Sequence, residues 1–199
     1  MNVLERKMKF KKKISKFYKE IIFKLKKKIN LDKQILELAS LNELFNYFGT
    51  DKGTEVMNQY QKNPSKTDQK LIGHGYAQFY EKHLNIYKND KINILEIGTW
   101  KGASVAAFYH YFKNAIIFCI DKNFKFQFES NRVNFFNCDT ENFTDIKNLE
   151  KYFIEKKSES FEVIIDDGSH NYTDILNNFQ NFFKRIKPGG FYIIEDFNH

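Results

Sequence analysis

The chain has 199 residues and is 42% hydrophobic, which is enough for one packed domain and excludes a disordered chain. Its formal net charge of +7 is unevenly placed, because residues 1–33 hold 13 Lys and Arg against 3 Asp and Glu. The remaining residues hold 19 basic and 22 acidic side chains, so we do not expect a nucleic-acid partner.

Cys119 and Cys138 have no CxxC or paired spacing, and we expect both to be reduced thiols in or near the core. No apolar run typical of a secretory signal follows the basic N-terminus. No stretch approaches the roughly 18–20 apolar residues of a transmembrane helix. These features predict a cytoplasmic protein.

Residues 3–29 are predicted to form one basic amphipathic helix, within an extension that covers residues 1–33. Apolar residues recur in this helix mostly every three or four positions, with lysines between them. Two interpretations stay open. The helix lies on an anionic membrane as a peripheral contact, or it is a solvated or partner-docking extension.

Residues 34–90 are predicted to be a cap region of helices and loops. Helical periodicity over residues 33–48 is followed by a glycine-containing loop. A second helix, over residues 76–87, places Tyr76, Tyr80 and His83 near one face.

Residues 91–199 alternate between apolar strands and helical segments. The predicted strands cover residues 92–98, 115–121, 133–139, 161–168 and 191–197, and the predicted helices cover residues 103–112, 146–156 and 171–187. This order predicts an α/β fold with a doubly wound parallel sheet.

The first of these strands ends in the segment LEIGTWKGAS, where Gly98 and Gly102 flank the turn into a helix. Glycine lets the backbone approach a ligand closely, and a helix N-terminus offers free N–H groups. The G-x-x-x-G spacing differs from the dinucleotide fingerprint and argues against a pyrophosphate ligand. A purely structural turn is the alternative.

Acidic residues stand at the tips of the next two strands. Asp121 is placed to accept hydrogen bonds from ribose hydroxyls, and Asp139 is placed to receive an adenine amino group. Either acid alone is typical of a cap or a turn. Together with Glu96, and in strand order, they favour a nucleoside-containing cofactor.

This arrangement resembles the class I S-adenosylmethionine-dependent methyltransferases over about residues 91–199. The segment ILEIGTWKGAS is similar to their first motif, and KPGGFYIIED is similar to the turn that leads into their fifth strand. The resemblance implies that S-adenosylmethionine is the cofactor. We assign its binding to Glu96, Gly98, Gly102, Asp121 and Asp139, with Asp166 and Tyr76 as further contacts.

Carboxylates also gather at the ends of the fourth and fifth strands. Asp166 and Asp167 end the fourth strand, and Glu195 and Asp196 end the fifth. Neighbouring strands lie about 4.8 Å apart, so these acids can converge on one point. Crowded carboxylates repel one another unless a hard cation lies between them, and oxygen donors favour Mg²⁺, Mn²⁺ or Ca²⁺ over zinc.

His170 lies three residues after Asp167, on the loop over the same point. An imidazole there can take the proton of a substrate hydroxyl, and a metal would help that hydroxyl to deprotonate. The alternative is a loop histidine that caps the next helix.

The combination resembles the sugar O-methyltransferases of the mycinamicin and tylosin type, which methylate deoxysugar hydroxyls with Mg²⁺. Upstream, YFGTDKGT and HGYAQFYEKHL extend the resemblance. It implies that Asp167, Glu195 and Asp196 bind the metal and that His170 is the general base. It also implies an acceptor sugar on a small molecule or a glycan.

The chain ends at His199, directly after these residues, whereas the class I fold continues with further strands. We therefore expect a truncated core with an exposed strand edge, which a homo-oligomer would cover. Two alternatives stay open. One is a catalytically inactive cofactor-binding protein, and the other is an O-methyltransferase of a different small hydroxyl acceptor.

Overall fold

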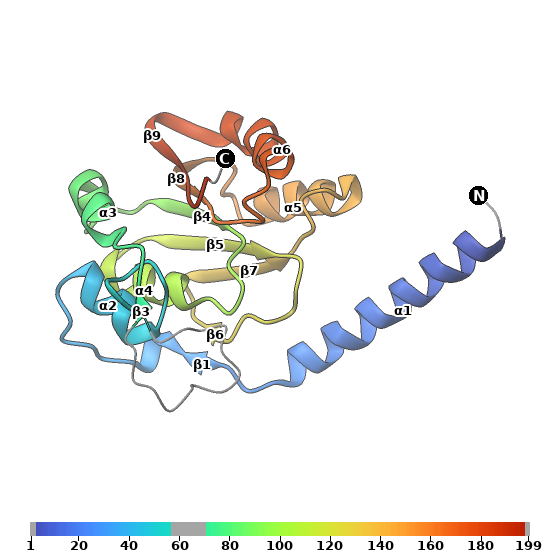
Figure 1. The fold of residues 1–199 in the computed structure, drawn as a ribbon, viewed down its shortest axis with the longest axis horizontal. Helices are drawn as coiled ribbons and strands as arrows, with labels where there is room; N and C mark the ends of the chain where they lie inside the picture. The colour runs from blue at the N-terminus through green and yellow to red at the C-terminus, as the bar shows by residue number, and fades with distance from the viewer. Residues whose placement is uncertain (1–2, 57–70, 198–199) are drawn as a thin grey trace.

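The computed structural model describes residues 3–56 and 71–197, whose arrangement is shown in Figure 1. Five parallel strands form the main sheet in the order β7-β5-β4-β8-β9. They are β4 (Asn93–Ile97), β5 (Ile116–Asp121), β7 (Val133–Asn137), β8 (Phe161–Asp166) and β9 (Ile186–Ile194). The chain leaves β4 toward one edge for β5 and β7 and toward the other for β8 and β9, which confirms the predicted doubly wound sheet.

Helices cover both faces of this sheet, and the side chains of β4 alternate between them. The helices that follow the strands are α4 (Ala103–Tyr111), α5 (Phe143–Glu155) and α6 (Tyr172–Phe182). Ile94 packs in the cluster that contains Phe108 of α4. Leu95 packs in the opposite cluster, which contains Phe153 of α5 and Phe182 of α6. The central strand β4 is therefore buried on both sides, as is usual for a parallel sheet covered by helices on both faces.

The cap region contributes two helices to the face that α4 covers. These are α2 (Leu41–Phe48) and α3 (Ala77–Leu84). The ring of Phe45 lies 5.4 Å from that of Phe108, and the ring of Tyr80 lies 5.3 Å from it. Residues before the first strand thus build part of the same core, and the boundary at residue 90 stays a prediction.

The predicted helix over residues 33–48 is wrong in its first half, because α2 begins only at Leu41. The reason is a capping box, in which the Glu43 N–H donates to the Ser40 hydroxyl while the Ser40 N–H donates to the Glu43 carboxylate. This reciprocal pair satisfies N–H groups that a helix start leaves open and marks the first turn.

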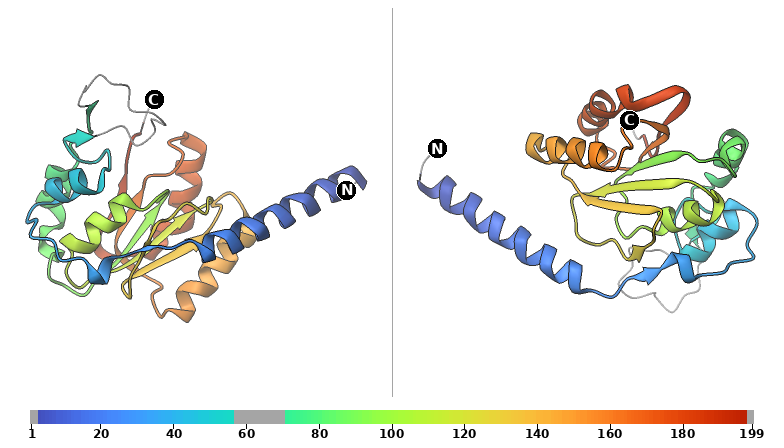
Figure 2. Two further views of the ribbon diagram at one scale, coloured as in Figure 1. Left: turned by 90° about the horizontal axis from the view of Figure 1, so that it is seen from below. Right: turned by 180° about the vertical axis from the view of Figure 1, so that it is seen from behind.

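The predicted N-terminal helix also ends earlier than expected, since α1 covers Val3–Leu25. Residues beyond it form β1 (Ile29–Asn30), which pairs in parallel with β6 (Phe128–Glu129), and a 3₁₀ turn, η1 (Leu31–Lys33). The Ile29 N–H donates to the Gln127 carbonyl, and this strand pairing replaces the expected last helical turn. Figures 1 and 2 show α1 leading away from the sheet.

The last predicted helix, over residues 171–187, is also too long. In the structure α6 ends at Phe182 and a 3₁₀ turn, η3 (Phe183–Arg185), follows it. Ile186 already pairs with Phe161 of β8, and a Cβ atom on Gly190 would lie 2.6 Å from the Glu162 carbonyl oxygen. Close pairing with β8 therefore extends β9 backward, at the expense of the helix.

Short elements complete the fold: β2 (Glu55–Val56) pairs antiparallel with β3 (Leu71–Ile72), and η2 (Asn85–Tyr87) follows α3. Cys119 and Cys138 are free and buried, as expected. Among the residues that the structure describes, no helix has the length and apolar character needed to cross a membrane.

The C-terminal part of α1 is anchored in the core by one side chain. Phe23 is buried, with its ring 5.5 Å from that of Phe124 and 5.3 Å from that of Phe135. Phe23→Ala should lower the free energy of unfolding by about 3 kcal/mol in urea titrations, because it leaves a cavity among aromatic rings. Phe17→Ala, in the same helix but 60% exposed, is the control and should change it by less than about 0.5 kcal/mol. Equal effects would show that α1 does not pack as described.

Candidate functional site

A cavity of about 260 Å³ lies at the carboxyl ends of β4, β5 and β8, where the strand order reverses. This is the crevice in which doubly wound sheets bind ligands. Of the residues predicted for the site, those that line the cavity are Gly98, Gly102, Asp121, Asp139, Asp167 and His170. Lining residues that the sequence analysis missed include Thr50, Asp51, Thr99, Trp100, Asn123, Ser169, Asp174 and Asn178.

The two predicted glycines are required by the backbone of the turn after β4. Gly98 has φ of +85°, and a Cβ atom there would lie 2.0 Å from the Asp167 carbonyl oxygen. Gly102 has φ of +88°, and its Cβ atom would lie 2.2 Å from the ring of Phe126. Both positions therefore exclude a side chain, which lets the turn after β4 pack directly against the Asp167 backbone and the Phe126 ring.

The carboxylate of Asp121 is fixed at the tip of β5 by two backbone donors. The Trp100 N–H donates to Oδ2 at 2.8 Å, and the Asn123 N–H donates to Oδ1 at 2.6 Å. Asp139 follows β7, and its N–H donates to the Asp145 carboxylate at 3.2 Å. Both acids thus reach the cavity from successive strand tips, as the sequence predicted.

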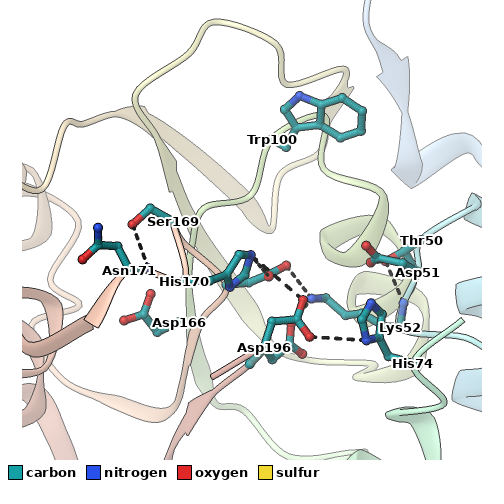
Figure 3. A network of polar contacts seen from close by, with 12 residues as sticks. Thr50, Asp51, Lys52, His74, Trp100, Asp166, Ser169, His170, Asn171 and Asp196 are labelled. Atoms are coloured by element: carbon teal, nitrogen blue, oxygen red, sulfur yellow. Dashed lines mark hydrogen bonds and ion pairs between the residues drawn. The ribbon is translucent and has the colours of Figure 1, made fainter. Parts of the chain in front are cut away.

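A second group of polar side chains contains two residues that line the cavity, Asp167 and His170, and one that does not, Asp196. Asp167, His170 and Asp196 each offer one side-chain atom that could bind a metal ion, and these three atoms all lie within 4.8 Å of one another. His170 Nε2 is 3.9 Å from Asp167 Oδ1 and 4.0 Å from Asp196 Oδ2. The Tyr76 hydroxyl donates to Asp196 Oδ1 at 2.5 Å, and His74 Nδ1 lies 3.3 Å from the same oxygen. Figure 3 shows the two imidazoles on either side of Asp196.

The Glu195 side chain points away from this group and into the protein interior. Its carboxylate contacts the Lys52 ammonium and accepts a hydrogen bond from the Tyr80 hydroxyl. Lys52 Nζ also lies 2.6 Å from Asp167 Oδ2. All three of Glu195, Lys52 and Tyr80 are almost completely buried, so a single ammonium group neutralises acids from two strand tips.

The charges of this buried group depend on one another. Burial alone would lower the pKa of Lys52, but the Glu195 and Asp167 carboxylates outweigh it and hold the pKa well above its ordinary value. Burial raises the pKa of Asp167, and Lys52 opposes that rise. Burial also raises the pKa of Glu96, and Lys52 again opposes that rise. Lys52 is therefore the cation that lets these acids be buried.

Three predicted cofactor residues lie outside the cavity wall. The Glu96 carboxylate is completely buried and does not line the cavity. Asp166 accepts a hydrogen bond from Asn178 at 3.0 Å, and burial raises its pKa to about 6. Tyr76 contacts Asp196 rather than the cavity. Cofactor contacts by Glu96, Asp166 and Tyr76 stay predictions.

Backbone strain marks the same region. Among the described residues, the non-glycine residues with positive φ are Trp100, Lys157, His170 and Asp196, and all but Lys157 belong to the site. Such conformations cost about 1–3 kcal/mol each and persist only where surrounding contacts impose them. Strained backbone is thus found at His170, which lines the cavity, and at Asp196, which lies close to it.

The family described as a methyltransferase domain matches residues 95–197, slightly more than half of the chain. The chain belongs to this family. The match runs from β4 through β9 and contains both groups of site residues that follow the strands.

Two relatives carry names that agree with the predicted resemblance. Demethylmacrocin O-methyltransferase of Streptomyces fradiae is 28% identical over 130 residues, 62% of this chain and 32% of the relative. Mycinamicin VI 2''-O-methyltransferase of Micromonospora griseorubida is also 28% identical over 130 residues, 62% of this chain and 31% of the relative. The chain thus spans about a third of the length of these relatives.

A solved structure supports the fold. MycE methyltransferase in complex with Mg, SAH and mycinamycin VI superposes with a TM-score of 0.60 at 24% identity, covering 80% of this chain and 40% of that chain. Together with the family match, this confirms the predicted methyltransferase fold.

Lys52→Met tests the role of the buried ammonium. The variant leaves buried acids without a counter-charge, so we expect the free energy of unfolding to fall by about 3–5 kcal/mol at neutral pH. The control is Lys184→Met, because Lys184 is 66% exposed and 4.0 Å from Glu150, and it should change stability by less than about 0.5 kcal/mol. Adding Glu195→Gln to Lys52→Met should restore part of the loss. A Lys52→Met protein as stable as the control variant would contradict the buried ion pairs.

Proposed function

We propose that this chain is the cofactor-binding part of an S-adenosylmethionine-dependent O-methyltransferase that acts on a sugar hydroxyl with a divalent cation. The observation that carries the proposal is the position of Asp167. Its main chain forms the cavity wall beside Gly98, while its side chain belongs to the group with His170 and Asp196. A methyl donor and an acceptor hydroxyl would therefore meet at this residue.

The polar groups that line the cavity fit the proposed cofactor. The cavity volume of about 260 Å³ lies just below the range for small-molecule sites, roughly 300–1,000 Å³. Asp121 keeps lone pairs for the two ribose hydroxyls after it has accepted two backbone N–H groups. Asp139 also lines the cavity and is available for the adenine amino group.

The residues beside the cavity also fit a divalent cation. Asp167 and Asp196 each direct one oxygen toward His170, and we assign the cation to these two carboxylates. Glu195 as a third ligand stays a prediction, because both of its oxygens contact other side chains in the described arrangement. A bound cation supplies polarisation of the acceptor hydroxyl, which an alcohol needs at neutral pH.

His170 is the residue that would accept the proton. Its Nε2 lies on the side of Asp167 and Asp196, where the acceptor hydroxyl would be held. As the hydroxyl oxygen takes the methyl group, its proton would move to Nε2.

The expected homo-oligomer stays a prediction that sedimentation analysis can test.

The two halves of the site should respond separately to substitution. Asp121→Ala should weaken S-adenosylhomocysteine binding by about 10- to 150-fold in calorimetry, because a charge-assisted hydrogen bond to ribose is lost. Asp167→Asn combined with Asp196→Asn should abolish Mn²⁺ binding and leave that affinity unchanged. Asp90→Ala, on the exposed surface, is the control for both measurements. Loss of cofactor binding in the double variant would place Asp167 in the cofactor pocket and exclude the cation assignment.

The role of His170 is tested by methyl transfer from S-adenosylmethionine to a deoxysugar glycoside. His170→Ala should reduce the rate by about 10²–10⁴-fold with cofactor and Mn²⁺ affinities unchanged, because a general base is lost. His83→Ala is the matched control, since His83 lies on α3 against Phe79 and Phe191. An effect below about tenfold would assign His170 to the loop structure only. Cofactor binding without any transfer would favour the cofactor-binding alternative.

A further inference from the structure

The helix α1 presents two different faces. One face meets the body of the protein, where Phe23 packs against Phe124 and Phe135 and Lys16 Nζ lies 3.0 Å from Asp145 Oδ2. A helix turns by about 100° per residue, so Ile21 and Leu25 lie across the helix from Phe23. The body therefore covers only the Phe23 side.

The opposite face of α1 is a stripe of large apolar side chains open to solvent. They recur at intervals of three and four positions and are Ile14 (39% exposed), Phe17 (60%), Tyr18 (62%), Ile21 (39%), Ile22 (55%) and Leu25 (80%). Single exposed apolar residues are ordinary, but a contiguous row on one helix face marks an interaction surface. We call this row the α1 stripe.

Lysines border the α1 stripe and continue past the end of the helix. Lys19 and Lys24 are exposed within α1, and Lys26, Lys27 and Lys28 follow it directly. The last three also line a hollow of about 670 Å³ together with Lys33 and one acidic residue, Glu129. The apolar row thus adjoins a concave, positively charged surface.

From this arrangement we infer that α1 lies flat on an anionic lipid surface, with the α1 stripe inserted between the lipids and the lysines among the headgroups. Helices with one apolar and one lysine-rich face bind in this way, and the long lysine side chains reach the headgroup level. The charge of the segment selects this partner. Residues 1–33 hold 13 Lys and Arg against 3 Asp and Glu, so anionic headgroups would neutralise them.

A second copy of this chain is the competing occupant of the α1 stripe. Pairing two such helices would bring two strongly positive segments side by side, and the repulsion would oppose the apolar contact. The proposed contact between α1 and lipid is independent of methyl transfer, because no residue of the α1 stripe lines the site cavity.

The experiment is flotation of the full chain with vesicles of two compositions. Vesicles of phosphatidylcholine mixed with phosphatidylglycerol should retain the protein at low salt, and vesicles of phosphatidylcholine alone should not. Raising NaCl to about 1 M, where the Debye length is about 3 Å, should release it. Retention that is equal on both compositions or insensitive to salt would overturn the assignment to anionic lipid.

Two sets of variants test the stripe and the lysines. Replacing Phe17, Ile21 and Leu25 together by Gln should weaken partition by more than about tenfold, because the inserted apolar area is lost. Lys26→Gln and Lys27→Gln should each weaken it by about fivefold. The matched control is Ile35→Gln with Ile154→Gln, since both side chains are exposed outside α1, and it should leave partition unchanged.

Sedimentation of the same proteins without lipid separates the two occupants. A chain that floats with anionic vesicles, keeps its oligomeric state in the stripe variant and loses flotation in that variant supports the proposal. A dimer that the stripe variant dissociates, with no vesicle binding by the original chain, would overturn it. Urea titration should show the same stability for the stripe variant and the original chain, since all three replaced side chains are exposed.

Discussion

The ammonium group of Lys52 lies 2.6 Å from Asp167 Oδ2 and contacts the Glu195 carboxylate, deep under the carboxyl edge of the sheet. Without a cation at this position, acids from the tips of two neighbouring strands would be buried with like charge. Lys52 belongs to the segment between α2 and β2, so its ion pairs also fasten the cap region to the sheet. The geometry of the site depends on this contact.

Asp167 connects the cap contact to the two functions of the sheet edge. Its N–H donates to the Ile97 carbonyl at the end of β4, and its carbonyl oxygen occupies the space that a Cβ atom on Gly98 would need. Of its two carboxylate oxygens, Oδ2 contacts the Lys52 ammonium and Oδ1 lies near His170 Nε2. A small displacement of Asp167 would therefore alter both the cavity wall and the group that it forms with His170 and Asp196.

The charge of the molecule is separated in space as well as in sequence. The carboxyl edge of the sheet is rich in acids, whereas the excess of basic over acidic residues lies in residues 1–33, which contain α1. Phe23 and Lys16 attach this basic helix to the body, near β7 and the start of α5, so the helix is oriented and not merely tethered. A fixed orientation is what allows one face of α1 to remain available to a partner.

Patterns local in the chain were sufficient to predict the parallel sheet, the glycine turn after β4 and the acids at the strand tips, because each depends on neighbouring residues. The direction in which each acid points was not predictable: Glu195 faces Lys52 and Asp196 faces His170, although they are adjacent. Lys52 lies 115 residues from Asp167 and 143 from Glu195, and Ile29 pairs with Phe128 instead of continuing a helix. Only the tertiary structure decides such contacts, because pairing between distant segments outweighs local propensity and leaves no periodic signal in the sequence.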